Sequence, residues 1–175
     1  PSGAPPAIHG PSTKLDFELE MGYFIGGGGN ALGEPMDINE AHKAIFGCVL
    51  LNDWSARDVQ RWEYVPLGPF GSKNFGTTIS PWIVTQLALE ESQQVMHSRH
   101  EKQINPVPLK YLEEPENALW TPHITLDVYY TINDNSNNEK KEKKLISSSN
   151  SKYLYWSPEQ MVAHHTVTGC NMRAG

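Results

Sequence analysis

Residues 15–23 read LDFELEMGY, a stretch in which apolar side chains alternate with polar ones. The apolar members are Leu15, Phe17, Leu19, Met21 and Tyr23. This alternation predicts a half-buried β-strand whose opposite face carries Glu18 and Glu20 together. Two strand rises separate their Cα atoms by about 6 to 7 Å. At that spacing the two carboxylates repel each other in a shielded site unless a cation lies between them.

A third carboxylate, Asp53, directly follows Asn52 at the end of the apolar run CVLL, residues 48–51. Such a run is typical of a short buried strand, and polar groups that emerge at a strand end often build sites. Three oxygen ligands suit a hard cation such as Ca²⁺ or Mg²⁺ rather than zinc, which favours histidine or cysteine. Two simpler interpretations stay open. Glu18 and Glu20 could form the solvent face of an edge strand, and Asp53 could merely cap the helix that follows.

The segment after Asp53 predicts a helix with a polar side. Ser55 and Asp58 have the spacing of a capping box, so a helix is expected to begin there. It carries Arg57, Gln60 and Tyr64 at positions that face the same way.

Lys73 follows a predicted loop, residues 65–72, that is rich in glycine and proline. Loops of this kind commonly carry functional side chains. The glycines near Lys73 lack the Gly-Lys-Ser/Thr pattern of a phosphate loop, so nucleotide binding is rejected. Alone, Lys73 could be a surface lysine, and Arg57 could simply pair with Asp58 or Asp53. The two positive side chains, Arg57 and Lys73, lie within about twenty residues of the chain together with Gln60 and Tyr64. All four are residue types that bind an anionic oxygen substrate.

The remaining elements follow from capping residues and periodicity. A short helix is expected after Asp37, with Gly47 as its left-handed stop. A capping box at Ser157 predicts a helix from Pro158 to about Thr168. A strand is expected at residues 79–84, where Pro81 indicates an edge strand or the start of a strand. A second strand is expected at residues 124–132, a helix around residues 90–97, and a solvated hairpin tip at residues 139–144.

Composition excludes several classes of protein. The 175 residues carry a formal net charge of −6 and no uniformly positive patch, which argues against a nucleic-acid partner. No apolar stretch is long enough to cross a membrane, and the proline-rich start lacks the parts of a signal peptide. Cys48 and Cys170 have no metal-type spacing, and Cys48 is expected to be buried and reduced. A soluble cytosolic protein of a size that suits one domain is indicated.

Two pairs of segments resemble the fumarylacetoacetate hydrolase superfamily. The first pair is ELE at residues 18–20 and NDWSARDVQ at residues 52–60. The second pair, WEYVPLGPF at residues 62–70 and KNFGTTISPW at residues 73–82, narrows the resemblance to the branch that acts in tyrosine and phenylalanine breakdown. That branch hydrolyses the carbon–carbon bond of 4-fumarylacetoacetate to fumarate and acetoacetate, so a diketo acid is the implied substrate.

The resemblance also implies an architecture. The expected fold is α+β and β-rich, a mixed β-sandwich or roll that is incomplete at both ends. Residues 1–14 would be a linker or loop, and residues 15–175 part of the C-terminal catalytic domain. A cytoplasmic homodimer is implied.

Matching positions carry over the metal ligands of the family. Glu18, Glu20 and Asp53 match calcium ligands. Asp53, Lys73 and Thr77 match positions around a second, magnesium-type ion, where the lysine would contribute a backbone oxygen.

The catalytic and substrate-binding positions carry over in the same way. Gln60 and Tyr64 match substrate contacts, while Arg57, Gln60 and Lys73 match groups that stabilise charge during cleavage. Water attack next to a ketone develops an oxyanion and then an enolate, and both need preorganised positive partners.

The histidine that serves as general base in the family, the glutamate that orients it and a further calcium-binding aspartate have no counterpart among these residues. The 175-residue chain alone is therefore expected to bind metal weakly and not to turn over substrate. Two alternatives stay open: another chemistry of the superfamily, such as acylpyruvate hydrolysis or oxaloacetate decarboxylation, and a truncated remnant without catalysis.

Overall fold

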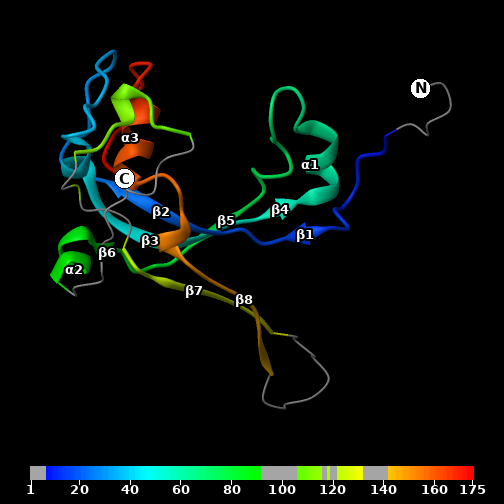
Figure 1. The fold of residues 1–175 in the computed structure, drawn as a ribbon. Coiled ribbons are helices and arrows are strands. Elements are labelled where there is room, and N and C mark those ends of the chain that lie inside the picture. Colours follow the sequence, from blue (N-terminus) through cyan, green and yellow to red (C-terminus); the bar gives the residue numbers. More distant parts are fainter. Residues whose placement is uncertain (1–6, 92–105, 116–117, 119–121, 132–141) are drawn as a thin grey trace. The chain divides into compact units, whose positions relative to one another are not determined.

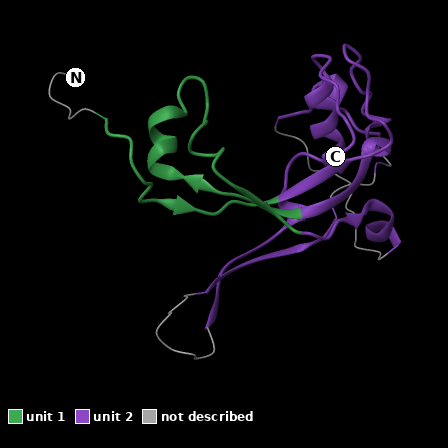
Figure 2. Cartoon of the chain, turned by 180° about the vertical axis from the view of Figure 1, so that it is seen from behind, with its two compact units in different colours: residues 1–20, 50–80 green, residues 21–49, 81–175 purple. Residues whose placement is uncertain are grey.

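The computed structural model describes residues 7–91, 106–115, 118, 122–131 and 142–175. Contacts group the chain whose fold is drawn in Figure 1 into two compact units, which Figure 2 colours separately. The first unit comprises residues 1–20 and 50–80, and the second comprises residues 21–49 and 81–175.

In the first unit, β1 (Leu15–Asp16) pairs antiparallel with β4 (Ser55–Ala56), and α1 (Arg57–Glu63) follows β4 directly. The end of β3 (Ile45–Asp53) pairs antiparallel with β5 (Thr77–Ile79). Within the full sheet, β3 lies between β5 and β2 (Leu19–Ile25). These short strands bring residues 15–18 beside residues 53–56, so that candidate site residues from both segments lie near one another.

The strand predicted over residues 15–23 is interrupted between β1 and β2. The backbone N–H of Phe17 donates to the Asp16 side chain over 2.9 Å. The N–H of Glu18 donates to the side-chain oxygen of Asn52 over 3.0 Å. Because side chains accept these hydrogen bonds, the two residues do not join a continuous strand ladder.

The capping box predicted at Ser55 is wrong. Ser55 is fully buried in β4, and its hydroxyl donates to Glu18 over 3.1 Å. The N-cap of α1 is Ala56, which makes no side-chain cap bond. Asp58 accepts hydrogen bonds from Ser12 and Thr13 instead. Both side chains of the expected cap therefore form hydrogen bonds with residues far away in the sequence.

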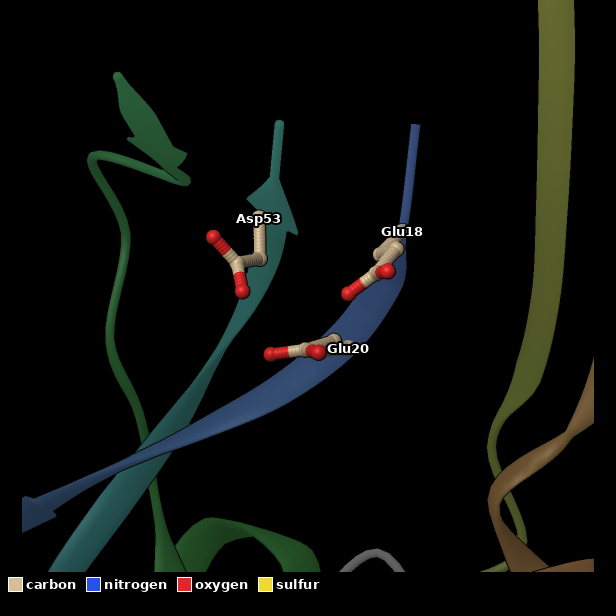
Figure 3. A group of neighbouring side chains, drawn as sticks. All are labelled: Glu18, Glu20 and Asp53. Atoms are coloured by element: carbon tan, nitrogen blue, oxygen red, sulfur yellow. The ribbon is translucent and has the colours of Figure 1, made fainter. Parts of the chain in front are cut away.

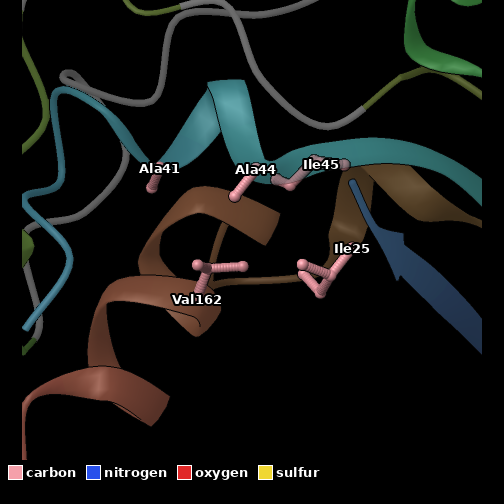
Figure 4. Close-up of a cluster of buried hydrophobic side chains, with 5 residues drawn as sticks. All are labelled: Ile25, Ala41, Ala44, Ile45 and Val162. Atoms are coloured by element: carbon pink, nitrogen blue, oxygen red, sulfur yellow. The ribbon is translucent and has the colours of Figure 1, made fainter. Parts of the chain in front are cut away.

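The second unit has its core where β2 ends against the 3-10 helix η1 (Ala41–Ala44) and α3 (Pro158–Thr166) (Figure 4). The buried members of this core are Ile25, Ala41, Ala44, Ile45 and Val162. A smaller buried cluster adds Ile38, Leu112 and Ala163. The 3-10 helix η2 (Lys110–Leu112) thereby packs against α3.

The helix expected after Asp37 is present only as η1, and Gly47 does not end it. Ile45 already begins β3, and Gly47 lies inside that strand opposite Thr85 of β6 (Val84–Thr85). A Cβ atom on Gly47 would lie 2.4 Å from the carbonyl oxygen of Val84. The glycine is needed for close approach of two strands rather than for a left-handed turn.

The strand predicted over residues 79–84 is also wrong. β5 ends at Ile79, β6 begins at Val84, and Pro81 lies between them. Proline lacks a backbone donor and so cannot continue the ladder. Residues 92–97 of the helix expected around residues 90–97 lie outside the described part, where α2 (Gln86–Glu91) is the preceding helix.

The clearest predicted strand is confirmed as β7 (Thr125–Thr131), although Ile132 lies outside the described residues. It pairs antiparallel with β8 (Lys143–Asn150). Residues 139–141 of the predicted hairpin tip lie outside the described residues. Residues 143–144 belong to β8 rather than to a turn.

The predicted capping box before α3 is confirmed. The Ser157 hydroxyl accepts from the Gln160 N–H over 3.0 Å, and the Gln160 side chain accepts from the Ser157 N–H over 3.0 Å. Gly169 follows the helix with φ +86. The 3-10 helix η3 (Ser151–Tyr153) joins β8 to this region. Within the described ranges, no helix has both the length and the apolar character needed to cross a bilayer.

The two cysteines are expected to differ in reactivity. Cys48 in β3 is only 3% exposed, and burial raises the pKa of its thiol, whereas Cys170 is exposed. The thiolate is the reactive form, so a water-soluble disulfide reagent should modify Cys170 rapidly and Cys48 only after unfolding. Mass spectrometry of the native protein checks this, and early modification of Cys48 would contradict it.

Candidate metal centre

Three carboxylates converge in the first unit (Figure 3). Glu18 lies just before β2, Glu20 lies in β2, and Asp53 ends β3. One carboxylate oxygen of each lies within 4.8 Å of the others. The N–H of Asp53 donates to the carbonyl oxygen of Glu18 over 3.1 Å, which fixes the two backbones side by side. The acids that the sequence singled out are thus brought together, as Ca²⁺ or Mg²⁺ ligands would have to be.

Two cationic side chains contact this acidic cluster. Nζ of Lys73 lies 2.5 Å from Glu18 Oε2 and 2.9 Å from Asp53 Oδ2. Arg57 donates to Glu18 over 2.9 Å and to Asp16 over 3.0 Å. Only 17% of the Lys73 side chain is exposed, so the surface-lysine alternative is wrong. The simple ion pair considered for Arg57, with Asp58 or Asp53, is also wrong. Arg57 binds Asp16 and Glu18 instead.

The electrostatics of the cluster separate its members. The hydrogen bond from Lys73 lowers the pKa of Glu18 despite partial desolvation. Burial disfavours the charged form of Lys73, but the bonds to Glu18 and Asp53 outweigh it and raise the pKa of the ammonium. Loss of surrounding water raises the pKa of Glu20, and the negative charges of Asp53 and Glu18 add to this effect. Of the two glutamates, Glu20 is therefore less stabilised as an anion than Glu18.

The charge balance and the donor atoms both fit a divalent cation. Four carboxylates face two positive side chains, so the group keeps two net negative charges when all are ionised. The three acids that converge offer oxygen ligands, which hard cations prefer. Lys73 and Arg57 contact the other carboxylates, whereas repulsion at Glu20 would be relieved by an added cation.

The other predicted site residues stand in different relations to this cluster. Gln60 accepts a hydrogen bond of 2.8 Å from Arg57, which confirms that the two share one side of α1. Thr77 pairs with Asp53 across the β3–β5 ladder. Tyr64 follows α1 and is 53% exposed. Among the described residues, the hydrogen bonds and ion pairs of the cluster do not include its side chain.

Sequence reasoning missed two members of this environment. Asp16 occupies the polar position two residues before Glu18 in the alternating pattern, so the period of the pattern could have found it. Ser55 carried a stronger local signal as a helix cap, which hid its contact with Glu18. Outside the cluster, sequence reasoning also missed Glu63, which contacts the loop that precedes Lys73.

The comparison with protein families shows to which family the chain belongs. A family model described as fumarylacetoacetate (FAA) hydrolase C-terminal matches residues 1–175. The chain belongs to this family. A crystal structure of a yeast fumarylacetoacetate hydrolase family protein superposes with a TM-score of 0.52 at 16% identity, covering 91% of this chain and 51% of that one. That likeness confirms the predicted β-rich α+β fold.

Curated members of the family are much closer in sequence. A fumarylacetoacetase from Dictyostelium discoideum is 53% identical over 165 residues, which cover 94% of this chain and 36% of that protein. A fumarylacetoacetase from Arabidopsis thaliana is 49% identical over 175 residues, which cover 100% of this chain and 38% of that protein. The chain thus spans little more than a third of the length of these two family members.

Proposed function

We propose that the whole protein containing this chain is a fumarylacetoacetase, a cation-dependent hydrolase that cleaves 4-fumarylacetoacetate to fumarate and acetoacetate. The observation that carries the proposal is the convergence of three carboxylates with two cationic side chains. It occurs in a chain 53% identical to a protein of that name. A homodimer in the cytoplasm and a role in tyrosine and phenylalanine breakdown belong to the same proposal.

Glu18, Glu20 and Asp53 are the proposed ligands of Ca²⁺, and their carboxylate oxygens are within 4.8 Å of one another. A second, magnesium-type ion is proposed at Asp53, Thr77 and the backbone oxygen of Lys73. A divalent cation bound here would polarise and orient the dione oxygens. The three acidic residues would hold the metal ion, while the positive side chains of Lys73 and Arg57 limit the repulsion among the carboxylates.

Arg57, Gln60 and Lys73 are the proposed catalytic groups of this chain. Water adds to the ketone carbon and loses a proton to a base, and the carbon–carbon bond then breaks with its electron pair on the acetoacetate fragment. The resulting enolate carbon takes up a proton, which balances the hydrolysis. Hydrogen-bond donors beside the growing negative charge lower the barriers to water addition and to carbon–carbon cleavage. The side chains of Arg57 and Lys73 already lie at the acidic cluster. Gln60 and Tyr64 are proposed to bind the substrate.

The general base is proposed to come from a histidine outside residues 1–175. The 175-residue chain alone is accordingly proposed to bind the cation weakly and to lack turnover. Comparing the chain with the whole protein tests this, since equal rates of hydrolysis would contradict it.

Substrate profiling of the whole protein tests the proposed reaction. With Ca²⁺ and Mg²⁺ present, 4-fumarylacetoacetate should yield fumarate and acetoacetate, and a chelator should abolish product formation. Preference for an acylpyruvate or for oxaloacetate would assign another chemistry of the superfamily. A folded protein without turnover of any of the three would be a non-catalytic remnant.

Replacing Glu20 by glutamine is expected to weaken Ca²⁺ binding about tenfold or more, because one of three anionic ligands is lost. Isothermal titration calorimetry measures the dissociation constant. Glu34→Gln, an exposed acid of the second unit, is the matched control and should leave the affinity unchanged. Unchanged affinity in both Glu20→Gln and Asp53→Asn would remove the carboxylates from the proposed ligand set.

A further inference from the structure

Glu63, the last residue of α1, holds the loop that leads to Lys73. Its carboxylate accepts hydrogen bonds from the backbone N–H groups of Phe70, Gly71 and Ser72 over 2.7, 3.1 and 2.8 Å. The Ser72 hydroxyl donates to the same carboxylate over 2.5 Å. Four donors thus converge on one side chain.

The loop held in this way determines where Lys73 begins. Ser72 is fully buried, and its carbonyl oxygen accepts from the N–H of Ala56 over 2.9 Å. The N–H of Lys73 donates to the carbonyl oxygen of Phe70 over 3.0 Å. The backbone before the lysine is therefore tied both to the end of α1 and to β4 beside its beginning.

A lysine side chain loses much conformational freedom when it is fixed in one position. Nζ of Lys73 nevertheless lies between Glu18 and Asp53. A loosely held loop would offer the ammonium many other positions and would weaken both ion pairs. The loop anchor and the ion pairs consequently support each other.

We propose that Glu63 is a positioning residue, which fixes loop 70–72 and thereby sets Lys73 between Glu18 and Asp53. Its importance for catalysis rests on the proposed function, in which Lys73 stabilises developing charge. The contacts with Lys73 themselves exist independently of that function and are measured without substrate.

Asp58 on the same helix provides a matched control. It also accepts hydrogen bonds from a neighbouring segment, through Ser12 and Thr13. These bonds hold the pKa of Asp58 well below its usual range, and the bonds from Ser72 and its neighbours lower the pKa of Glu63 to about 2. Both are thus ionised anchors of α1, but only Glu63 holds the loop before Lys73.

The test is the acetylation rate of the Lys73 amine in the whole protein, with a chelator present and each lysine followed by mass spectrometry. Exposed Lys110 is the internal reference. Glu63→Gln should raise the rate of Lys73 about three- to tenfold relative to Lys110, because a loosened loop lets the amine leave its two carboxylate partners and become exposed to the reagent. Asp58→Asn should leave this ratio within about twofold of the wild-type value.

An unchanged ratio in folded Glu63→Gln overturns the proposal, and so does an equal rise in Asp58→Asn, which would mean a general loosening of α1. If Glu63→Gln fails to fold, Ser72→Ala decides, since it removes only one of the four donors. It should raise the ratio in the same direction by a smaller factor, and no rise overturns the proposal.

Turnover then separates this inference from the proposed function. In an active whole protein, Glu63→Gln should lower kcat and have little further effect when Lys73 is already methionine. Additive losses would overturn the action through Lys73. A protein that shows the expected acetylation pattern without hydrolysing the substrate would refute the proposed function alone.

Discussion

Replacing Lys73 by methionine is expected to lower kcat of the whole protein about 10²- to 10³-fold, the usual cost of removing a donor that stabilises an oxyanion. The side chain is largely buried and lies against Glu18 and Asp53, so solvent cannot easily replace it. KM should change less, because the lysine acts mainly on charge that develops during the reaction. Steady-state kinetics with 4-fumarylacetoacetate measure both constants.

Cation affinity gives the same variant a second, opposite readout. Loss of the ammonium adds to the net negative charge around the three converging acids, so Ca²⁺ binding should be as tight or tighter. Glu20→Gln is expected to weaken it. Lys14→Met, an exposed lysine in the first unit, controls for the general loss of a positive charge. A kcat within about threefold of the wild-type value would contradict a catalytic role for Lys73.

Gly29→Ala is expected to destabilise the protein by about 3 kcal/mol. A Cβ atom there would lie 1.7 Å from the carbonyl oxygen of Met172, and φ is +66. The left-handed conformation costs about 1 to 2 kcal/mol with a side chain, and overpacking adds about 1 to 3 kcal/mol. Asn30 binds both Cys170 and Met172, so the loop cannot retreat freely from this contact.

Gly28→Ala is the control for this substitution. Gly28 has φ +92 but open space around the position of a Cβ atom, so only the conformational cost of about 1 to 2 kcal/mol remains. Thermal unfolding should show a loss in Tm of about 6 to 12 °C for Gly29→Ala and clearly less for Gly28→Ala. Equal losses would show that the close contact with Met172 does not constrain the loop.

Much of the acidic cluster could be predicted from local pattern. Period-two alternation placed Glu18 and Glu20 on one side, and the end of an apolar run placed Asp53 at a strand terminus. The structure brings all three together. The same pattern extended to Asp16, but only the structure shows that Asp16 accepts a hydrogen bond from Arg57.

Local pattern failed where distant partners competed for the same side chain. Ser55 and Asp58 have capping-box spacing, yet they bind Glu18 and residues 12–13. Gly47 resembled a helix stop, but its lack of a side chain admits the neighbouring strand. In each case the residue type was read correctly as special, while the partner that requires it lies far away in sequence.

By itself the sequence determined the features that depend on chain neighbours: the capping box that begins α3, the alternation of β7, and the face shared by Glu18 and Glu20. Only the tertiary structure decided which distant side chains pair with the acidic residues. The Glu18–Lys73 pair spans 55 positions and the Glu18–Ser55 bond spans 37. Pairing over such separations is selected by desolvation and close packing in the folded chain, which no local spacing encodes.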